Sequence, residues 1–174
     1  DLVEITPSSV LAYNGEGTVV ERPTTRIKEA LETADMGKFD HYMIKEIFEQ
    51  PEALEATFAD GNNAQQIEER FGSGATALFD KVKSVQIVAC GTSFHAGMVA
   101  RYWMEELAGV SCEVEVASEF RYRKRVQHEG TLLVAISQSG ETADTLAALR
   151  NATEGEFIGS LVVANVDNSS LVRE

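Results

Sequence analysis

Two short stretches of the sequence combine hydroxyl side chains with a glycine in a pattern that suits phosphate binding. The first is Cys90-Gly91-Thr92-Ser93, and the second is Ser137-Gln138-Ser139-Gly140-Glu141-Thr142; each follows an apolar run. Hydroxyls, backbone N–H groups and the positive end of a helix dipole all attract phosphate, and glycine lets the backbone approach it closely. Lys124 is the single lysine from Ser84 onward, so a phosphate bound here would not meet a P-loop lysine. The pattern points away from nucleoside triphosphates.

The same residues could instead be ordinary helix caps. Serine and threonine are common at the turn from a strand into a helix, and Ser139 ahead of Gly140 could cap a helix without any ligand. For either loop alone the cap is the favoured interpretation. Two such loops on one small sheet, the second with four small or hydroxylic side chains in six residues, favour a phosphate site.

Other catalytic templates match these loops poorly. A dinucleotide fingerprint needs GxGxxG, whereas the first loop offers Gly91 and Gly97 with Phe94 and His95 between them. A nucleophile elbow needs GxSxG, and neither loop supplies both glycines. A serine hydrolase is therefore a weak candidate.

The remaining polar and aromatic candidates are given structural roles. The three histidines lie in separate segments without metal-ligand spacing, so no metal is expected, and His95 alone is close enough to a loop to touch a ligand. The run Arg121-Tyr122-Arg123-Lys124-Arg125 is interpreted as a solvated helix face rather than a nucleic-acid patch. Tyr102 and Trp103 fall at helical spacing and are expected to pack.

From Ser84 onward, apolar runs alternate with helical patterns, which predicts a doubly wound α/β fold with a parallel, flavodoxin-like sheet. The predicted strands are Val85 to Cys90, Cys112 to Ala117, Thr131 to Ser137 and Leu161 to Val166, and the predicted helices are Phe94 to Leu107 and Glu141 to Asn151. Ligands of such sheets bind at the carboxyl ends of the strands, so we expect the two loops to face each other there. The chain stops soon after the fourth strand, and we expect that end to be truncated.

Two different patterns precede this region. Ser9 to Tyr13 and Thr18 to Arg22 predict a β-hairpin, which has no other β partner nearby and is expected to be the edge of a sheet lying upstream. Thr24 to Lys83 predicts a helical connector. In it, Pro51 should end one helix and start the next, and Gly72-Ser73-Gly74 should break the helix that follows.

Composition narrows the functional classes. The chain has 174 residues, of which 44% are hydrophobic, and its 15 Lys and Arg against 28 Asp and Glu give a net charge of −13. This composition predicts a folded globular protein, and the acidic balance argues against a duplex nucleic-acid partner. No apolar run is long enough to span a membrane and no signal peptide opens the chain. Cys90 and Cys112 lack CxxC spacing and are interpreted as buried, reduced thiols of a cytoplasmic protein.

The residues of both loops also resemble a known family. Val88 to Gly97 (VACGTSFHAG), Ala117 to Arg123 (ASEFRYR) and Ser137 to Leu146 (SQSGETADTL) are similar to the first sugar-isomerase (SIS) domain of the glutamine–fructose-6-phosphate aminotransferases. His41 to Pro51 (HYMIKEIFEQP) resembles the segment that joins the glutaminase domain of that family to its isomerase domain. The resemblance implies three parts: the edge of the glutaminase domain in residues 1–26, a helical linker in 27–83 and a truncated first SIS domain in 84–174.

Site residues follow from this resemblance. In the family, ammonia from glutamine converts fructose-6-phosphate to glucosamine-6-phosphate without a metal or organic cofactor. The resemblance implies that the sugar phosphate is held by Ser93, Ser137, Gln138, Ser139 and Thr142, with Thr92 near the sugar hydroxyls. It also implies a homodimer.

The family's reacting groups have no counterpart in this sequence. Its nucleophilic cysteine, and the later glutamate, histidine and lysine that open the sugar ring and move the proton, are not matched. We therefore expect a fragment that binds a hexose phosphate weakly at best and does not turn it over, so no residue here is assigned a catalytic role. The alternatives are a non-catalytic SIS-type regulatory module that senses a sugar phosphate, and an interaction scaffold indifferent to sugar phosphates.

Overall fold

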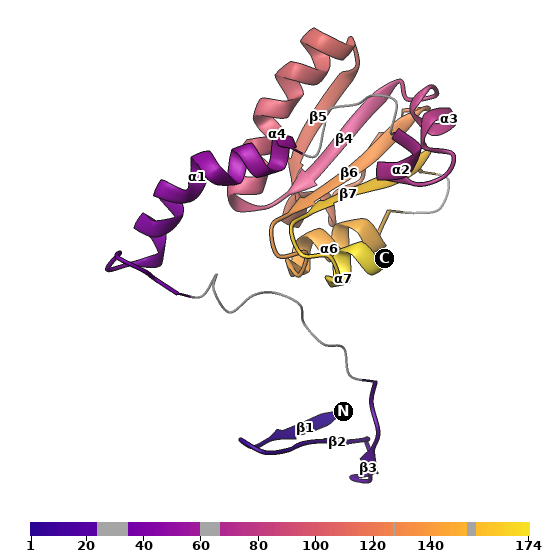
Figure 1. Ribbon diagram of the computed structural model, residues 1–174. Helices are drawn as coiled ribbons and strands as arrows, with labels where there is room; N and C mark the ends of the chain where they lie inside the picture. Colours follow the sequence, from indigo (N-terminus) through magenta and orange to yellow (C-terminus); the bar gives the residue numbers. More distant parts are fainter. Residues whose placement is uncertain (24–34, 60–66, 127, 153–155) are drawn as a thin grey trace. The chain divides into compact units, whose positions relative to one another are not determined.

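The structure is a computed structural model that describes residues 1–23, 35–59, 67–126, 128–152 and 156–174 (Figure 1). The chain forms two compact units, Asp1–Asn62 and Asn63–Glu174. Within the described ranges, no helix has both the length and the apolar character that crossing a membrane requires.

The second unit is built on a four-stranded parallel sheet with the order β5-β4-β6-β7. Its strands are β4 (Ser84–Ala89), β5 (Ser111–Val116), β6 (Thr131–Ser137) and β7 (Gly159–Ala164). The predicted doubly wound α/β fold is confirmed, and β6 has the predicted bounds. The other three strands lie one or two residues earlier than predicted.

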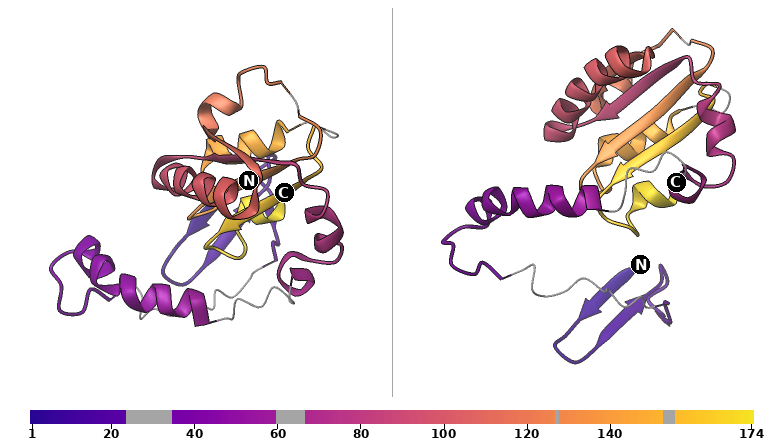
Figure 2. Two further views of the ribbon diagram at one scale, coloured as in Figure 1. Left: turned by 90° about the horizontal axis from the view of Figure 1, so that it is seen from above. Right: turned by 45° about the horizontal axis from the view of Figure 1, so that its top comes forward.

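Helices cover both faces of this sheet, as Figures 1 and 2 show. The helices of the unit are α2 (Ile67–Phe71), α3 (Ala75–Phe79), α4 (Gly91–Trp103) with the π-helical turn η3 (Met104–Ala108), α5 (Ala117–Phe120), α6 (Ala143–Arg150) and α7 (Ser170–Arg173). Successive strand residues point to opposite faces: Leu132 packs in a cluster with residues of α3 and α4, and Leu133 in a cluster with residues of α5, α6 and α7. Each large apolar side chain that is buried in this way contributes about 1.5 to 3 kcal/mol to the free energy of unfolding.

The strand order has a topological switch point at the centre of the sheet, where the side on which the next strand is added changes. From β4 the chain crosses to β5 on one side, and it then returns to place β6 on the other side of β4. Ala89 of β4 pairs with Ile136 of β6, so the carboxyl ends of these two strands lie side by side. The helix after β4 packs on one face and the helix after β6 on the other. In open α/β sheets this point is where ligands bind.

The first unit contains a three-stranded antiparallel sheet made of β1 (Leu2–Ile5), β2 (Val10–Tyr13) and β3 (Val19–Val20). The predicted hairpin is confirmed as β2 and β3. The expectation that it has no other β partner is wrong, because β1 pairs with β2 from Leu2↔Tyr13 to Ile5↔Val10. β1 was not predicted because the alternation of apolar and polar residues in Leu2-Val3-Glu4-Ile5 is short. A hydrogen bond between the Thr6 and Ser9 hydroxyls holds the turn between β1 and β2.

Pro51 does not end a helix as predicted. A single helix, α1 (Tyr42–Ala59), runs through it. An interior proline removes one backbone hydrogen bond and kinks a helix, but the turns on either side keep their own bonds. The axis of α1 bends along its length in Figure 2, so the proline produces a bend and not a boundary.

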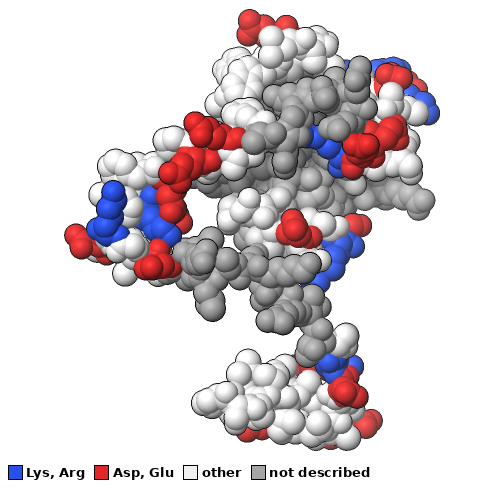
Figure 3. All heavy atoms as spheres, viewed as in Figure 1, with Lys and Arg blue, Asp and Glu red and all other residues white. Residues whose placement is uncertain are grey.

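Two other expectations about side chains are wrong. Tyr102 and Trp103 are 66% and 61% exposed, because helical spacing defines a face but not what covers it. The basic run follows α5, which ends at Phe120, and is not helical. Its arginines form ion pairs with carboxylates from other parts of the chain: Arg121 with Asp144, Arg123 with Glu115 and Arg125 with Glu156. On the face drawn in Figure 3, basic side chains likewise stand beside acidic ones.

The break at Gly72-Ser73-Gly74 is confirmed: α2 ends at Phe71 and α3 begins at Ala75. Glu68 of α2 joins the two helices, because its carboxylate accepts the backbone N–H groups of Gly74 and of Thr76. Hydrogen bonds from the hydroxyl and backbone N–H of Thr76, followed by the N–H of Gly74, lower the pKa of Glu68. The charged carboxylate is therefore the form that the fold stabilises.

We predict that Glu68→Gln lowers the free energy of unfolding at neutral pH but not in acid. A carboxyl whose pKa is lower in the folded chain stabilises the fold above the pKa of the unfolded chain, and this contribution is lost as the pH falls through the folded value. Urea unfolding of parent and variant at pH 7, 5 and 3 measures the difference, with Glu69→Gln as the neighbouring control. A difference that stays constant down to pH 3 would contradict the prediction.

Candidate functional site

The two hydroxyl loops leave neighbouring strands at the same rim of the sheet. The first loop follows β4 and the second follows β6, and these strands pair in parallel up to Ala89↔Ile136. Cys90 and Ser137 are therefore the next residues along two adjacent strands. The sequence analysis predicted that both loops lie at one rim of the sheet. The strand order adds that they lie side by side, at the switch point.

The first loop leads directly into α4. Gly91 has φ +56, and Cys90 before it is extended and makes no side-chain cap. Thr92 is exposed and Ser93 half-buried in the first turn of the helix, where backbone N–H groups have no partner inside the helix. The Thr145 hydroxyl of α6 lies 4.0 Å from the Cys90 sulfur, which links this loop to the helix of the second loop.

The second loop is held together by its own hydroxyls. Ser137 is buried; its Oγ accepts the Gly140 N–H at 3.0 Å and lies 3.1 Å from Oγ1 of Thr142. Ser139 is exposed, and its Oγ accepts the Glu141 N–H at 3.2 Å. Because serine can accept and donate at once, the hydroxyl hydrogen of Ser139 remains able to donate to a ligand.

Helix capping does not account for these residues. The residue before the first turn of α6 is Thr142 and not Ser139, and Thr142 makes no side-chain cap hydrogen bond. Ser139 instead bonds two residues ahead, inside the loop. Gln138 is exposed beside it. The side chains of Gln138, Ser139 and Thr142 thus lie just before α6 without capping it, an arrangement that suits an anionic ligand.

Gly140 lies in unusually close contact with the chain beyond β7. Its φ is +65, and a Cβ added there would lie 2.0 Å from Oγ of Ser169 and 2.4 Å from its Cβ. Ser169 is 2% exposed, and its hydroxyl is buried without a hydrogen-bond partner in the part of the chain that the structure describes. The segment from Asn165 to Leu171 therefore belongs to the surroundings of the site, and the sequence analysis did not identify it. The one local signal was a carboxylate, Glu141, in an otherwise neutral loop.

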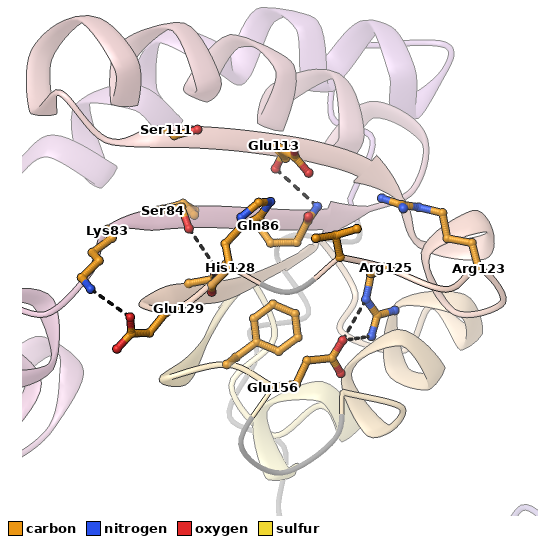
Figure 4. A pocket seen from close by; sticks show the side chains of 14 residues that line it. Lys83, Ser84, Gln86, Ser111, Glu113, Arg123, Arg125, His128, Glu129 and Glu156 are labelled. Carbon is orange, nitrogen blue, oxygen red and sulfur yellow. Dashed lines mark hydrogen bonds and ion pairs between the residues drawn. The ribbon is translucent and has the colours of Figure 1, made fainter.

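A cavity of about 420 Å³ lies at the opposite ends of the strands (Figure 4). It is lined by the first residues of three strands, Ser84, Ser111 and Thr131, and by none of the predicted site residues. The basic side chains Lys83, Arg123 and Arg125 at this cavity each form an ion pair with a glutamate. Doubly wound sheets bind ligands at the carboxyl ends of strands, so we assign the candidate site to the two loops and not to this cavity.

Parallel strands with hydroxyl-rich loops at a switch point define a doubly wound domain suited to a phosphorylated ligand. Residues 78–174 match the family model of the SIS domain, and the chain belongs to that family.

Over its whole length the chain is 55% identical to a glutamine–fructose-6-phosphate aminotransferase (isomerizing) of Pseudomonas putida and 52% identical to the enzyme of that name from Haemophilus influenzae. The chain spans 29% of the length of these relatives. The resemblance stated from the loop motifs is thereby confirmed.

Solved structures show the same relationship. The C-terminal domain of glucosamine-fructose-6-phosphate aminotransferase from Francisella tularensis superposes with a TM-score of 0.73 at 52% identity, covering 79% of this chain and 39% of that one. Tagatose-6-phosphate ketose/aldose isomerase from Escherichia coli superposes with a TM-score of 0.64 at 16% identity, covering 77% and 37% of the two chains, and so shares the fold.

Proposed function

We propose that this chain is the part of a glutamine–fructose-6-phosphate aminotransferase that binds the sugar phosphate, either fructose-6-phosphate or glucosamine-6-phosphate. The observation that carries the proposal is the pairing of β4 with β6, which puts the two hydroxyl loops at one switch point. The sequence identity to aminotransferases of that name supports the choice of ligand.

In this proposal the phosphate is held by neutral donors. Ser93, Ser137, Gln138, Ser139 and Thr142 contact the phosphate, and Thr92 contacts the sugar hydroxyls. The first turns of α4 and α6 add backbone N–H groups and the positive ends of two helix dipoles. The chain contributes binding and needs no metal or organic cofactor for it. Groups that hydrolyse glutamine and isomerise the sugar belong to other parts of the enzyme, so the chain by itself is expected to be inactive.

Three further assignments belong to the same proposal. The chain divides into the edge of a glutaminase domain (1–26), a linker (27–83) and part of a first SIS domain (84–174), and it works in the cytoplasm. It associates as a homodimer. An edge strand, β7, and the exposed apolar side chains of Tyr102, Trp103 and Leu107 support association. Sedimentation of the chain tests the dimer.

Isothermal titration calorimetry tests the phosphate site directly. We predict heat of binding with fructose-6-phosphate and much less with fructose, because the proposed donors serve the phosphate. Ser139→Ala should weaken binding by about 1 to 3 kcal/mol, the loss expected when a charged partner loses its hydrogen bond. Ser160→Ala, at an exposed serine of β7, is the matched control. Equal heats for the two sugars would remove the proposal, and unchanged affinity with lowered stability in Ser139→Ala would restore a purely structural role.

A further inference from the structure

The loop that is proposed to bind phosphate contains one formal charge, and that charge is negative. It belongs to Glu141, two residues after Ser139. A carboxylate facing a bound phosphate would repel it and weaken binding. If the proposed function holds, on which this inference rests, the loop must direct the Glu141 side chain elsewhere.

The structure shows where this carboxylate goes. Oε1 of Glu141 accepts the backbone N–H of Ser170 at 2.7 Å, and Ser170 is the first residue of α7. This backbone hydrogen bond, followed by one with the Ser170 side chain and by the nearby charge of Arg173, lowers the pKa of Glu141. The first turn of α7 thus holds the carboxylate in its charged form.

Two backbone hydrogen bonds connect the same two segments. The carbonyl of Gly140 accepts the N–H of Leu171 at 3.0 Å, and the carbonyl of Gln138 accepts the N–H of Asn165 at 3.2 Å. Gln138 and Gly140 are the residues on either side of Ser139. Three hydrogen bonds therefore connect the segment from Asn165 to Leu171 with the loop residues that flank Ser139.

The segment that makes these bonds is itself anchored. Leu171 is 1% exposed and packs in the same core cluster as Leu146 and Ala148 of α6. Figures 1 and 2 both draw α7 beside α6. Because α6 starts at the loop and α7 is fixed against α6, the bonds tie the loop to a packed part of the domain and not to a free end.

We propose that Glu141 is a positioning residue: it fastens the hydroxyl loop to the first turn of α7, and so sets the orientation in which Gln138 and Ser139 meet the phosphate of the sugar. Its negatively charged carboxylate accepts a hydrogen bond from the start of α7 and does not face the ligand.

Calorimetry of the whole chain with fructose-6-phosphate separates the possible roles of Glu141. Glu141→Ala removes the acceptor and should lower the affinity about 10-fold, whereas Glu141→Gln keeps an oxygen acceptor and should stay within about 3-fold of the parent. Glu106→Ala removes the same charge from an exposed position of η3 and should change nothing. An affinity that rises in both Glu141 variants would place the carboxylate at the phosphate and overturn the proposal. Equal affinity in the parent and in both Glu141 variants would overturn it as well.

A second measurement needs no ligand. In ¹⁵N–¹H NMR spectra of the unliganded chain, Glu141→Ala should shift the amide resonances of Ser170, Gln138 and Ser139, and Glu141→Gln should shift them less. If the parent does not bind fructose-6-phosphate, the proposed function fails and these spectra still decide the contact. Unchanged Gln138 and Ser139 resonances in Glu141→Ala would overturn the positioning role even where the parent binds.

Discussion

Replacing Gly140 by alanine should lower the free energy of unfolding by about 2 to 5 kcal/mol and remove most binding of fructose-6-phosphate. The backbone of Gly140 is left-handed, with φ +65, which costs about 1 to 2 kcal/mol for a residue with a Cβ. The new methyl group would also lie 2.0 Å from Oγ of Ser169, and overpacking of this kind costs about 1 to 3 kcal/mol. Urea unfolding and calorimetry measure the two effects.

Gly91 offers a matched control at the other loop. Its φ is +56, yet a Cβ added there would meet nothing within 4 Å. Gly91→Ala should therefore cost only the conformational part, about 1 to 2 kcal/mol. If Gly140→Ala costs no more than Gly91→Ala, the close approach to Ser169 is not a feature of the folded chain.

A second substitution should relieve the overlap. Ser169→Gly in the Gly140→Ala background removes both atoms that the new methyl group would meet, and leaves the Cβ of Ala164 at 3.7 Å as the nearest remaining neighbour. The double variant should recover the packing part of the loss and keep the conformational part. Such non-additivity is expected only between residues in contact.

The fold could be predicted because the centre of the sheet is buried on both faces. Burial on both sides makes the two central strands, β4 and β6, apolar runs with little alternation, and glycine and serine mark where they end. The common direction of parallel strands then places both loops at one rim, whatever the strand order. The order itself has no local signal: nothing near Ala89 indicates that it pairs with Ile136.

What the sequence did not reveal depends on partners far along the chain. Glu141 lies in a loop whose composition predicts a phosphate site, but its role depends on Ser170 after the next strand. The arginines after Phe120 were interpreted as a solvated surface because their carboxylate partners lie in other parts of the chain. Trp103 was expected to pack because its helix has apolar spacing, although it is exposed. Local pattern fixes which elements form, whereas these roles follow from which elements meet.

Arg125 is the arginine of this run with the largest expected effect on stability. Its side chain is 13% exposed and that of its partner Glu156 is 5% exposed. The guanidinium donates to Glu156 Oε1 and to the carbonyl of Phe120, at 3.0 and 2.8 Å, and lies 3.8 Å from the centre of the Phe120 ring. Arg125→Ala should lower the free energy of unfolding by about 3 to 5 kcal/mol, because it removes the guanidinium that is paired with a mostly buried carboxylate, together with its hydrogen bond to Phe120 and its contact with the Phe120 ring.

Arg123 is the control, two residues earlier in the same run. It also pairs with a glutamate, Glu115, but the two side chains are 49% and 16% exposed. Arg123→Ala should cost about 0 to 1 kcal/mol, and that cost should shrink in 1 M salt, whereas the cost of Arg125→Ala should persist. Equal and small costs for the two variants would show that water reaches Glu156.

Neutralising both members of the buried pair separates lost attraction from stranded charge. Arg125→Met combined with Glu156→Gln removes both charges of this pair and keeps most of the volume, so it should cost less than Arg125→Ala alone. If the double variant is as unstable as the single one, the loss comes from the hydrogen bond to Phe120 and the contact with its ring. In that case the arginine stabilises the core through Phe120, which is fully buried, and Glu156 serves mainly to keep that arginine in place.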